Sequence, residues 1–131
     1  MWHEINIIGT VGREPELRYT ADGKASCSFS VASNRKLQNG KQETIWFKVT
    51  AWDRMAENIS NYCKKGMTVH VIGRLVCTEQ GTPRTYTKQD GTTAASFEIV
   101  AKEFRIIDFK NGGNGQSQQR QQTEMNVEIP W

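Results

Sequence analysis

The sequence predicts an all-β fold, a small closed barrel of five strands with one short helix. Three observations carry this prediction: short segments of alternating apolar and polar residues, glycine-containing turns between them, and one segment with helical spacing. A chain of 131 residues is long enough for one such domain with its own core. We therefore expect one domain over residues 1–110 and a tail over residues 111–131.

The first part of the chain predicts one strand followed by two hairpins. Residues 5–11 form an apolar strand that a polar, proline-containing stretch closes. Turn sequences with glycine, where a positive φ is required, lie at residues 21–24 and 39–40. Between these turns, apolar residues alternate with serines over residues 26–31, which indicates a half-buried strand.

Residues 44–52 predict the most informative strand, because both of its faces can be read from the sequence. The residues on the expected core face are Ile45, Phe47, Val49 and Ala51. The residues on the opposite face are Trp46, Lys48, Thr50 and Trp52. Large aromatic side chains are costly to leave in water without a partner. An aromatic–cation–aromatic strip matches the bases and charged backbone of single-stranded nucleic acid, whereas burial of both faces in a sandwich or a subunit interface is the alternative.

One helix is predicted directly after this strand. Asp53 is its expected N-cap, and Gly66 is the expected left-handed stop beyond its end. Helical spacing gives it an apolar face made of Met55, Ile59, Tyr62 and Cys63.

The second part of the chain predicts two further strands and a projecting hairpin. Residues 69–75 alternate as a strand, and residues 77–94 contain several breakers, with Asp90-Gly91 as the expected hairpin tip. Ala95, Phe97 and Ile99 resume the alternation, and residues 104–109 close the domain. Five strands with a helix between the third and fourth are typical of an OB-fold, a Greek-key barrel, and a generic β-sandwich is the alternative.

Charge and cysteine content restrict the function classes. Residues 1–110 contain 16 Lys or Arg against 12 Asp or Glu, so the domain is basic and suits a polyanionic partner. Three cysteines without CxxC spacing suggest neither disulfides nor a zinc site, and Cys27 and Cys63 are expected to be buried apolar residues. No export signal or membrane span is suggested, and we expect a cytoplasmic protein without a cofactor or metal.

The composition changes after residue 110. The Asn-, Gly- and Gln-rich stretch has no residues worth burying, so we expect a disordered tether. The last residues combine carboxylates with apolar side chains, which predicts an interaction tip made of Glu128, Ile129, Pro130 and Trp131. The alternative is a solvated end without a partner.

With these elements placed, the chain resembles the bacterial single-stranded DNA-binding protein family over about residues 3–109 and at its last residues. The motifs that carry the resemblance are residues 6–12, 15–19, 46–49, 62–66, 72–75 and 129–130. The resemblance implies a homotetramer that binds and protects single-stranded DNA in replication, recombination and repair. It also implies that the tail recruits partner enzymes.

The family's functional positions can be carried over residue by residue. Its base-stacking aromatics fall on Trp46, Trp52 and Tyr86, and its subunit-interface position falls on Phe47. The family's basic backbone contacts fall on Lys48, Arg54 and Lys65, and we expect Arg74 and Arg84 as further phosphate contacts. The chain departs from the family where a tryptophan often precedes the second hairpin, since residues 34–37 read Asn-Arg-Lys-Leu. It departs again in the tail, which has only two acidic side chains, Glu124 and Glu128.

Two other function classes compete with this interpretation. An OB-fold nuclease would need clustered carboxylates, but the best pair, Asp53 and Glu57, is explained more simply by the start of a helix, so we expect no enzyme. An OB-fold primosomal accessory protein or RNA-binding chaperone would use the same aromatic residues to stack on RNA.

Overall fold

The computed structural model describes residues 1–109. The tail over 111–131, including its predicted tip at Glu128 to Trp131, lies outside the described residues. The elements follow in the order β1 (Ile5–Val11), β2 (Glu16–Tyr19), β3 (Ala25–Lys36), β4 (Gln42–Trp52), α1 (Asp53–Tyr62), β5 (Thr68–Leu75), β6 (Thr85–Thr87), β7 (Thr93–Ala95) and β8 (Phe97–Asp108).

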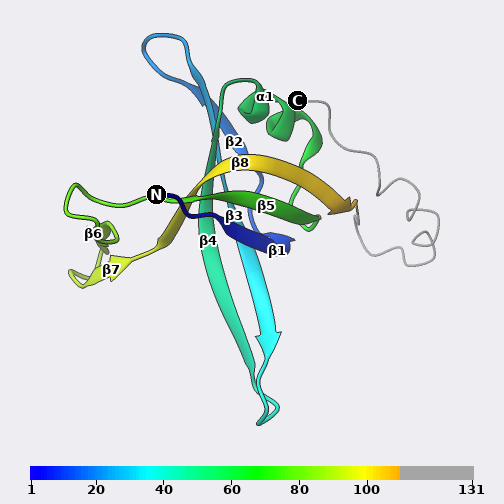
Figure 1. Cartoon of the computed structure of the whole chain (residues 1–131), viewed down its shortest axis with the longest axis vertical. Helices are drawn as coiled ribbons and strands as arrows, with labels where there is room; N and C mark the ends of the chain where they lie inside the picture. Colours follow the sequence, from blue (N-terminus) through cyan, green and yellow to red (C-terminus); the bar gives the residue numbers. More distant parts are fainter. Residues whose placement is uncertain (110–131) are drawn as a thin grey trace.

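Five of these strands close into a barrel in the order β1-β5-β8-β4-β3, and β1 pairs with β3 to complete the circuit. All of these pairings are antiparallel except that of β4 with β8. β2 extends the sheet beyond β3, and β6 pairs with β7 as a separate hairpin beside the barrel (Figure 1). The closed circuit with a helix between its third and fourth strands confirms the OB-fold and excludes the β-sandwich.

Closure brings the end of β1 very near β3. A Cβ added at Gly9 would lie 2.3 Å from the carbonyl oxygen of Ala32, so glycine permits this approach of two backbones. Inside the barrel, Phe29 and Phe104 meet edge to face with their centroids 5.7 Å apart. The largest fully buried side chains come from six elements and from Cys63 just after α1, and they are Phe104, Ile59, Ile99, Ile106, Val11, Val31, Val49, Val69, Val71, Cys27 and Cys63.

The predicted turns are present. Gly23, Gly40 and Gly91 have positive φ angles of 85°, 87° and 89°. The turn at Gly91 joins β6 to β7, as expected for the projecting hairpin. The hairpin of β3 and β4 continues well past the barrel (Figure 1), and this is where residues 34–37 lie.

The helix differs from expectation at both ends. Asp53 is wrong as the N-cap: Trp52 occupies that position without a side-chain capping bond, and Asp53 is the first helical residue with a φ of 58°. α1 packs against β2, β3 and β4, and its buried residues are Ala56 and Ile59, with Cys63 directly after it. The prediction that Tyr62 lies on the apolar face of the helix is wrong. Its side chain is 45% exposed, whereas Ile59 and Cys63 are fully buried.

Phe97 also departs from the predicted alternation. It has the same parity as the buried Ile99, yet 57% of its surface is exposed. Phe97 is the first residue of β8, and at this end of the strand no other described element covers the side of the sheet on which its ring lies. Its ring lies 5.9 Å from that of Phe47, so one half-buried and one exposed phenylalanine form an apolar edge there.

Candidate nucleic-acid interface

The polar face of β4 is open to solvent at one end. Trp46 is 52% exposed and Lys48 is exposed, while Thr50 and Trp52 are half-buried. On the other face, Val49 and Ala51 are fully buried. The predicted core face is confirmed at Val49 and Ala51, whereas Phe47 is half-buried against the core and Ile45 does not pack against it. No described residue of this chain buries the half of the polar face that carries Trp46.

A pocket of about 820 Å³ opens beside this end of β4. Four predicted site residues line it together, and they are Trp46, Lys48, Arg84 and Tyr86. Tyr86 comes from the β6–β7 hairpin and is 51% exposed, so the hairpin and the barrel contribute one aromatic residue each. A pocket lined by two exposed aromatic rings and three cationic side chains can accept a planar ring and a phosphate at the same time.

Sequence reasoning missed the part of the pocket that comes from neighbouring strands. Arg13 and Glu16 line it from the start of the chain, and Ser28 and Ser30 line it from β3. Ser30 was placed on the polar face of a strand, but it could be located near Trp46 only once the register Ser30↔Lys48 was known. The missing signal was thus strand pairing, which no local pattern supplies.

Gly12 sets the position of the Trp46 ring. A Cβ added at Gly12 would lie 2.4 Å from Cζ3 and 2.6 Å from Cη2 of Trp46, so the indole lies across the glycine. The backbone N–H of Gly12 donates a hydrogen bond of 2.9 Å to the carbonyl oxygen of Ser30, which holds the glycine in place. The ring therefore has one edge packed on backbone and a broad remaining surface in solvent.

An ion pair ties the pocket to the hairpin. The Arg84 guanidinium donates to Oε1 of Glu98, whose side chain is largely buried, and this contact raises the pKa of Arg84. Glu98 is also the cross-strand partner of Lys48. The pocket cations are thus partly balanced by a carboxylate, and Arg84 must leave Glu98 or share it in order to contact a phosphate.

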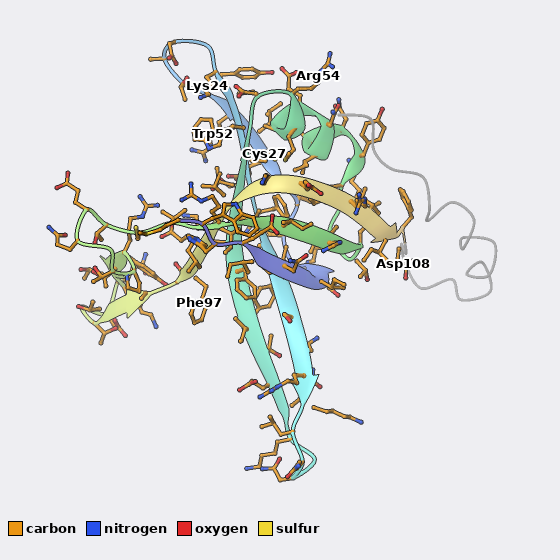
Figure 2. The ribbon with its side chains drawn as sticks, viewed as in Figure 1. Lys24, Cys27, Trp52, Arg54, Phe97 and Asp108 are labelled. Carbon is orange, nitrogen blue, oxygen red and sulfur yellow. The ribbon has the colours of Figure 1, made fainter. Side chains whose placement is uncertain are left out.

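The other end of the β4 face is arranged differently. The ammonium of Lys24 lies 5.1 Å from the centroid of the Trp52 ring, and Trp52 does not line the pocket. Figure 2 shows Lys24 at the β2–β3 turn above Trp52, with Arg54 at the start of α1 nearby. The Tyr19 hydroxyl donates to Glu57 Oε2 at 3.2 Å, and this hydrogen bond raises the pKa of Tyr19.

The structure places the remaining predicted cations outside the pocket. Arg54 and Lys65 are exposed at opposite ends of α1, and the Lys65 backbone N–H donates to Glu14 at 3.4 Å. Arg74 is exposed on β5, opposite Val100 of β8. These three residues surround the barrel and are not gathered at one point.

The cysteines and acidic residues of residues 1–109 are the remaining candidates for site chemistry. Among them no group of three or more His, Cys, Asp or Glu is placed to hold a metal ion. Cys27 and Cys63 are buried as expected, and burial raises the pKa of their thiols to about 11 and about 12, so both remain neutral. None of the helices in this part of the chain is long and apolar enough to cross a bilayer.

Comparison with known proteins agrees with this geometry. The model of the single-strand binding protein family matches residues 2–107. A single-stranded DNA-binding protein of Oceanobacillus iheyensis is 36% identical over 118 residues, which are 88% of this chain and 70% of that protein. Single-stranded DNA-binding protein 3 of Listeria innocua is 34% identical over 129 residues, covering 96% and 77% of the two chains. Single-stranded DNA-binding protein A of Bacillus subtilis is 34% identical over 119 residues, covering 89% and 66%. This chain belongs to the single-strand binding protein family.

Proposed function

We propose that this chain binds single-stranded DNA without sequence preference and protects it during replication, recombination and repair. The observation that carries the proposal is the pocket in which two half-exposed aromatic rings, Trp46 and Tyr86, lie beside Lys48 and Arg84. The names of the relatives support the ligand, since each is called a single-stranded DNA-binding protein. The proposed role is binding rather than catalysis, in the cytoplasm and at the nucleoid.

The mechanism follows from the chemistry of the pocket. Trp46 and Tyr86 stack on unpaired bases, with about 1–3 kcal/mol per stacked base, and Trp52 adds a third platform. Phosphates are contacted by the basic residues around the barrel, which are Lys48, Arg54, Lys65, Arg74 and Arg84. Every base has a π-face and every nucleotide a phosphate, so these contacts do not select a sequence. Duplex DNA is rejected because its bases are already stacked on each other.

Binding of labelled oligonucleotides tests the proposal. The full chain is titrated into oligo-dT, the corresponding oligo-rU and a duplex of equal length, and anisotropy is measured at two or more salt concentrations. We expect oligo-dT to bind most tightly, with a log–log salt slope of about −0.7 for each contacted phosphate. Tighter binding of oligo-rU would favour the RNA chaperone, and equal binding of the duplex or a salt-independent affinity would contradict the mechanism.

We further propose that the tail recruits partner enzymes through its last four residues, Glu128 to Trp131. Their apolar side chains beside carboxylates suit a basic, apolar socket on another protein. Deletion of these residues is expected to leave oligo-dT affinity unchanged and to abolish capture of replication and repair enzymes in a pull-down. Retained capture by the truncated chain would contradict this role.

A homotetramer is also proposed, with Phe47 and Phe97 in a subunit contact. The support is the apolar edge that the two rings form, in which the exposed side of Phe97 has no cover within residues 1–109. Phe97→Asp is expected to shift the sedimentation coefficient toward smaller species. Tyr62→Asp, at another exposed aromatic position on α1, is not expected to do so. An unchanged assembly of the Phe97 variant would contradict the contact.

A further inference from the structure

An exposed tryptophan lies before β1 and is held in place by its neighbours. Trp2 is 72% exposed, more than any other aromatic residue in the part of the chain that the structure describes. The ammonium of Lys102 lies 5.9 Å from the centroid of its ring, and the same ammonium is 3.9 Å from Glu4 Oε2. His3 Nε2 accepts the backbone N–H of Leu75 at 3.0 Å. Side-chain contacts therefore fix residues 2–4 against β5 and β8, while most of the indole surface remains in water.

The register of the strands connects Trp2 with the pocket. Lys48 of β4 is the cross-strand partner of Glu98 on β8. Val100 and Lys102 follow Glu98 at alternate positions on the outward face of the barrel. Lys102 lies at an irregularity of β8, because the register with β5 shifts between Gly73↔Ala101 and Ile72↔Glu103. Four residues of a strand span about 13 Å. Lys102 therefore lies within the reach of a single strand that already occupies the pocket, since OB-folds bind about 4–16 nucleotides.

This path has cations at Lys48, Arg74 and Lys102, and an exposed carboxylate, Glu103, directly follows Lys102. Arg74 projects beside Val100 from β5, between the pocket and Lys102. The carboxylate of Glu98 is paired with Arg84. The carboxylate of Glu4 is 3.9 Å from the Lys102 ammonium, so it balances that charge only weakly. The Lys102 ammonium lies over the Trp2 ring as the Lys24 ammonium lies over the Trp52 ring. Trp52 is half-buried, whereas Trp2 is largely exposed, so the rest of the Trp2 ring remains available for a base and Lys102 for an adjacent phosphate.

We propose that Trp2 and Lys102 form a second base-stacking site, which extends the single-strand track from the pocket across β8, past Arg74. One unpaired base stacks on the solvent-facing side of the Trp2 indole, and Lys102 contacts an adjacent phosphate. The site rests on the proposed function, because its ligand is the same strand that enters the pocket. Its occupant is an unpaired nucleotide and not a protein, since cations line the approach.

Trp2→Ala in the full chain tests this site, with Tyr62→Ala as the matched control. Tyr62 is an exposed aromatic residue at the end of α1, close to the start of β5 and remote from its end at Leu75. We expect Trp2→Ala to weaken oligo-dT binding roughly 5- to 150-fold, the range for loss of one stacked base, and Tyr62→Ala to bind as the wild type does. Both variants should melt as the wild type, because neither side chain is buried.

Two further measurements separate stacking from an indirect effect. Lys102→Gln should reduce the magnitude of the log–log salt slope by about 0.7, as expected for one lost phosphate contact. A variant with Phe at positions 46, 52 and 131 keeps Trp2 as its single tryptophan, and its emission should be quenched on titration with oligo-dT. Wild-type affinity of Trp2→Ala, or unquenched Trp2 emission in a complex detected by anisotropy, overturns the second site and leaves the proposed function standing. Failure of the wild-type chain to bind oligo-dT overturns both.

Discussion

The two ends of the β4 face carry the same residue type in different surroundings. Trp46 lies across Gly12 and lines an open pocket with Tyr86. Trp52 lies half-buried at the junction with α1, with the ammonium of Lys24 over its ring. Both tryptophans have the same parity in one strand. Strand parity thus decides the side on which a ring emerges, and residues from other elements decide whether its face is open to a base.

The largest expected effect separates these two ends. Trp46→Ala should weaken oligo-dT binding by about 1–3 kcal/mol, because it removes a stacking platform that is already open. Trp52→Ala should weaken it less, since a base must first displace Lys24 from the ring. Anisotropy with labelled oligo-dT measures both dissociation constants under the same salt conditions.

Trp52→Phe is the control for this comparison. Trp52 occupies the N-cap position of α1, so its removal can loosen the helix as well as the site. The phenylalanine variant keeps an aromatic ring and should bind almost as the wild type. Equal losses for the two alanine variants would show that the Lys24 contact has no effect on binding.

A substitution at Gly12 is expected to have the next largest effect. The methyl group of Gly12→Ala would lie 2.4 Å from the Trp46 ring, so the indole must move out of its present position. Gly12 is not among the residues with positive φ, so alanine does not strain the backbone itself. We expect a loss of about 1 kcal/mol in oligo-dT affinity, at the lower end of the stacking range, together with a shift of Trp46 emission.

A double-mutant cycle tests whether Gly12 acts through Trp46. In the Trp46→Ala background, Gly12→Ala should cause no further loss, because the ring that it displaces is absent. An additive loss would mean that Gly12 affects the site by another route, such as its backbone bond to Ser30.

Local patterns in the sequence were sufficient for the barrel but not for the site. The alternation at residues 44–52 predicted the strand and its two faces, and the Asn39-Gly40 and Asp90-Gly91 turns predicted the hairpins, because both signals depend only on neighbouring residues. The packing of Gly12 on Trp46 and of Lys24 on Trp52 depends on which strands pair and in what register. No pattern within one strand contains that information.

The exposure of Phe97 also could not be predicted from the pattern within one strand. Alternation with Ile99 gave it the correct parity, but the end of the covered barrel is a property of the closed sheet. Resemblance to a family supplied Tyr86 as a site residue, which the short β6 strand could not have revealed by periodicity. It did not supply Trp2 or Lys24, whose contacts with Lys102 and Trp52 become visible only in the folded structure.

The smallest expected effect concerns the lysine that covers Trp52. A cation over an exposed aromatic ring contributes about 0.5–1 kcal/mol, and a base that stacks on that face must replace it. Lys24→Met keeps most of the apolar stem and removes the charge. We therefore expect Trp52→Ala to cost about 0.5–1 kcal/mol more oligo-dT affinity in the Lys24→Met background than in the wild type. The four dissociation constants of this cycle measure the coupling. An equal cost in both backgrounds would mean that the ammonium and the base do not compete for the ring, and the difference between the two ends of β4 would then come from the burial of Trp52 alone.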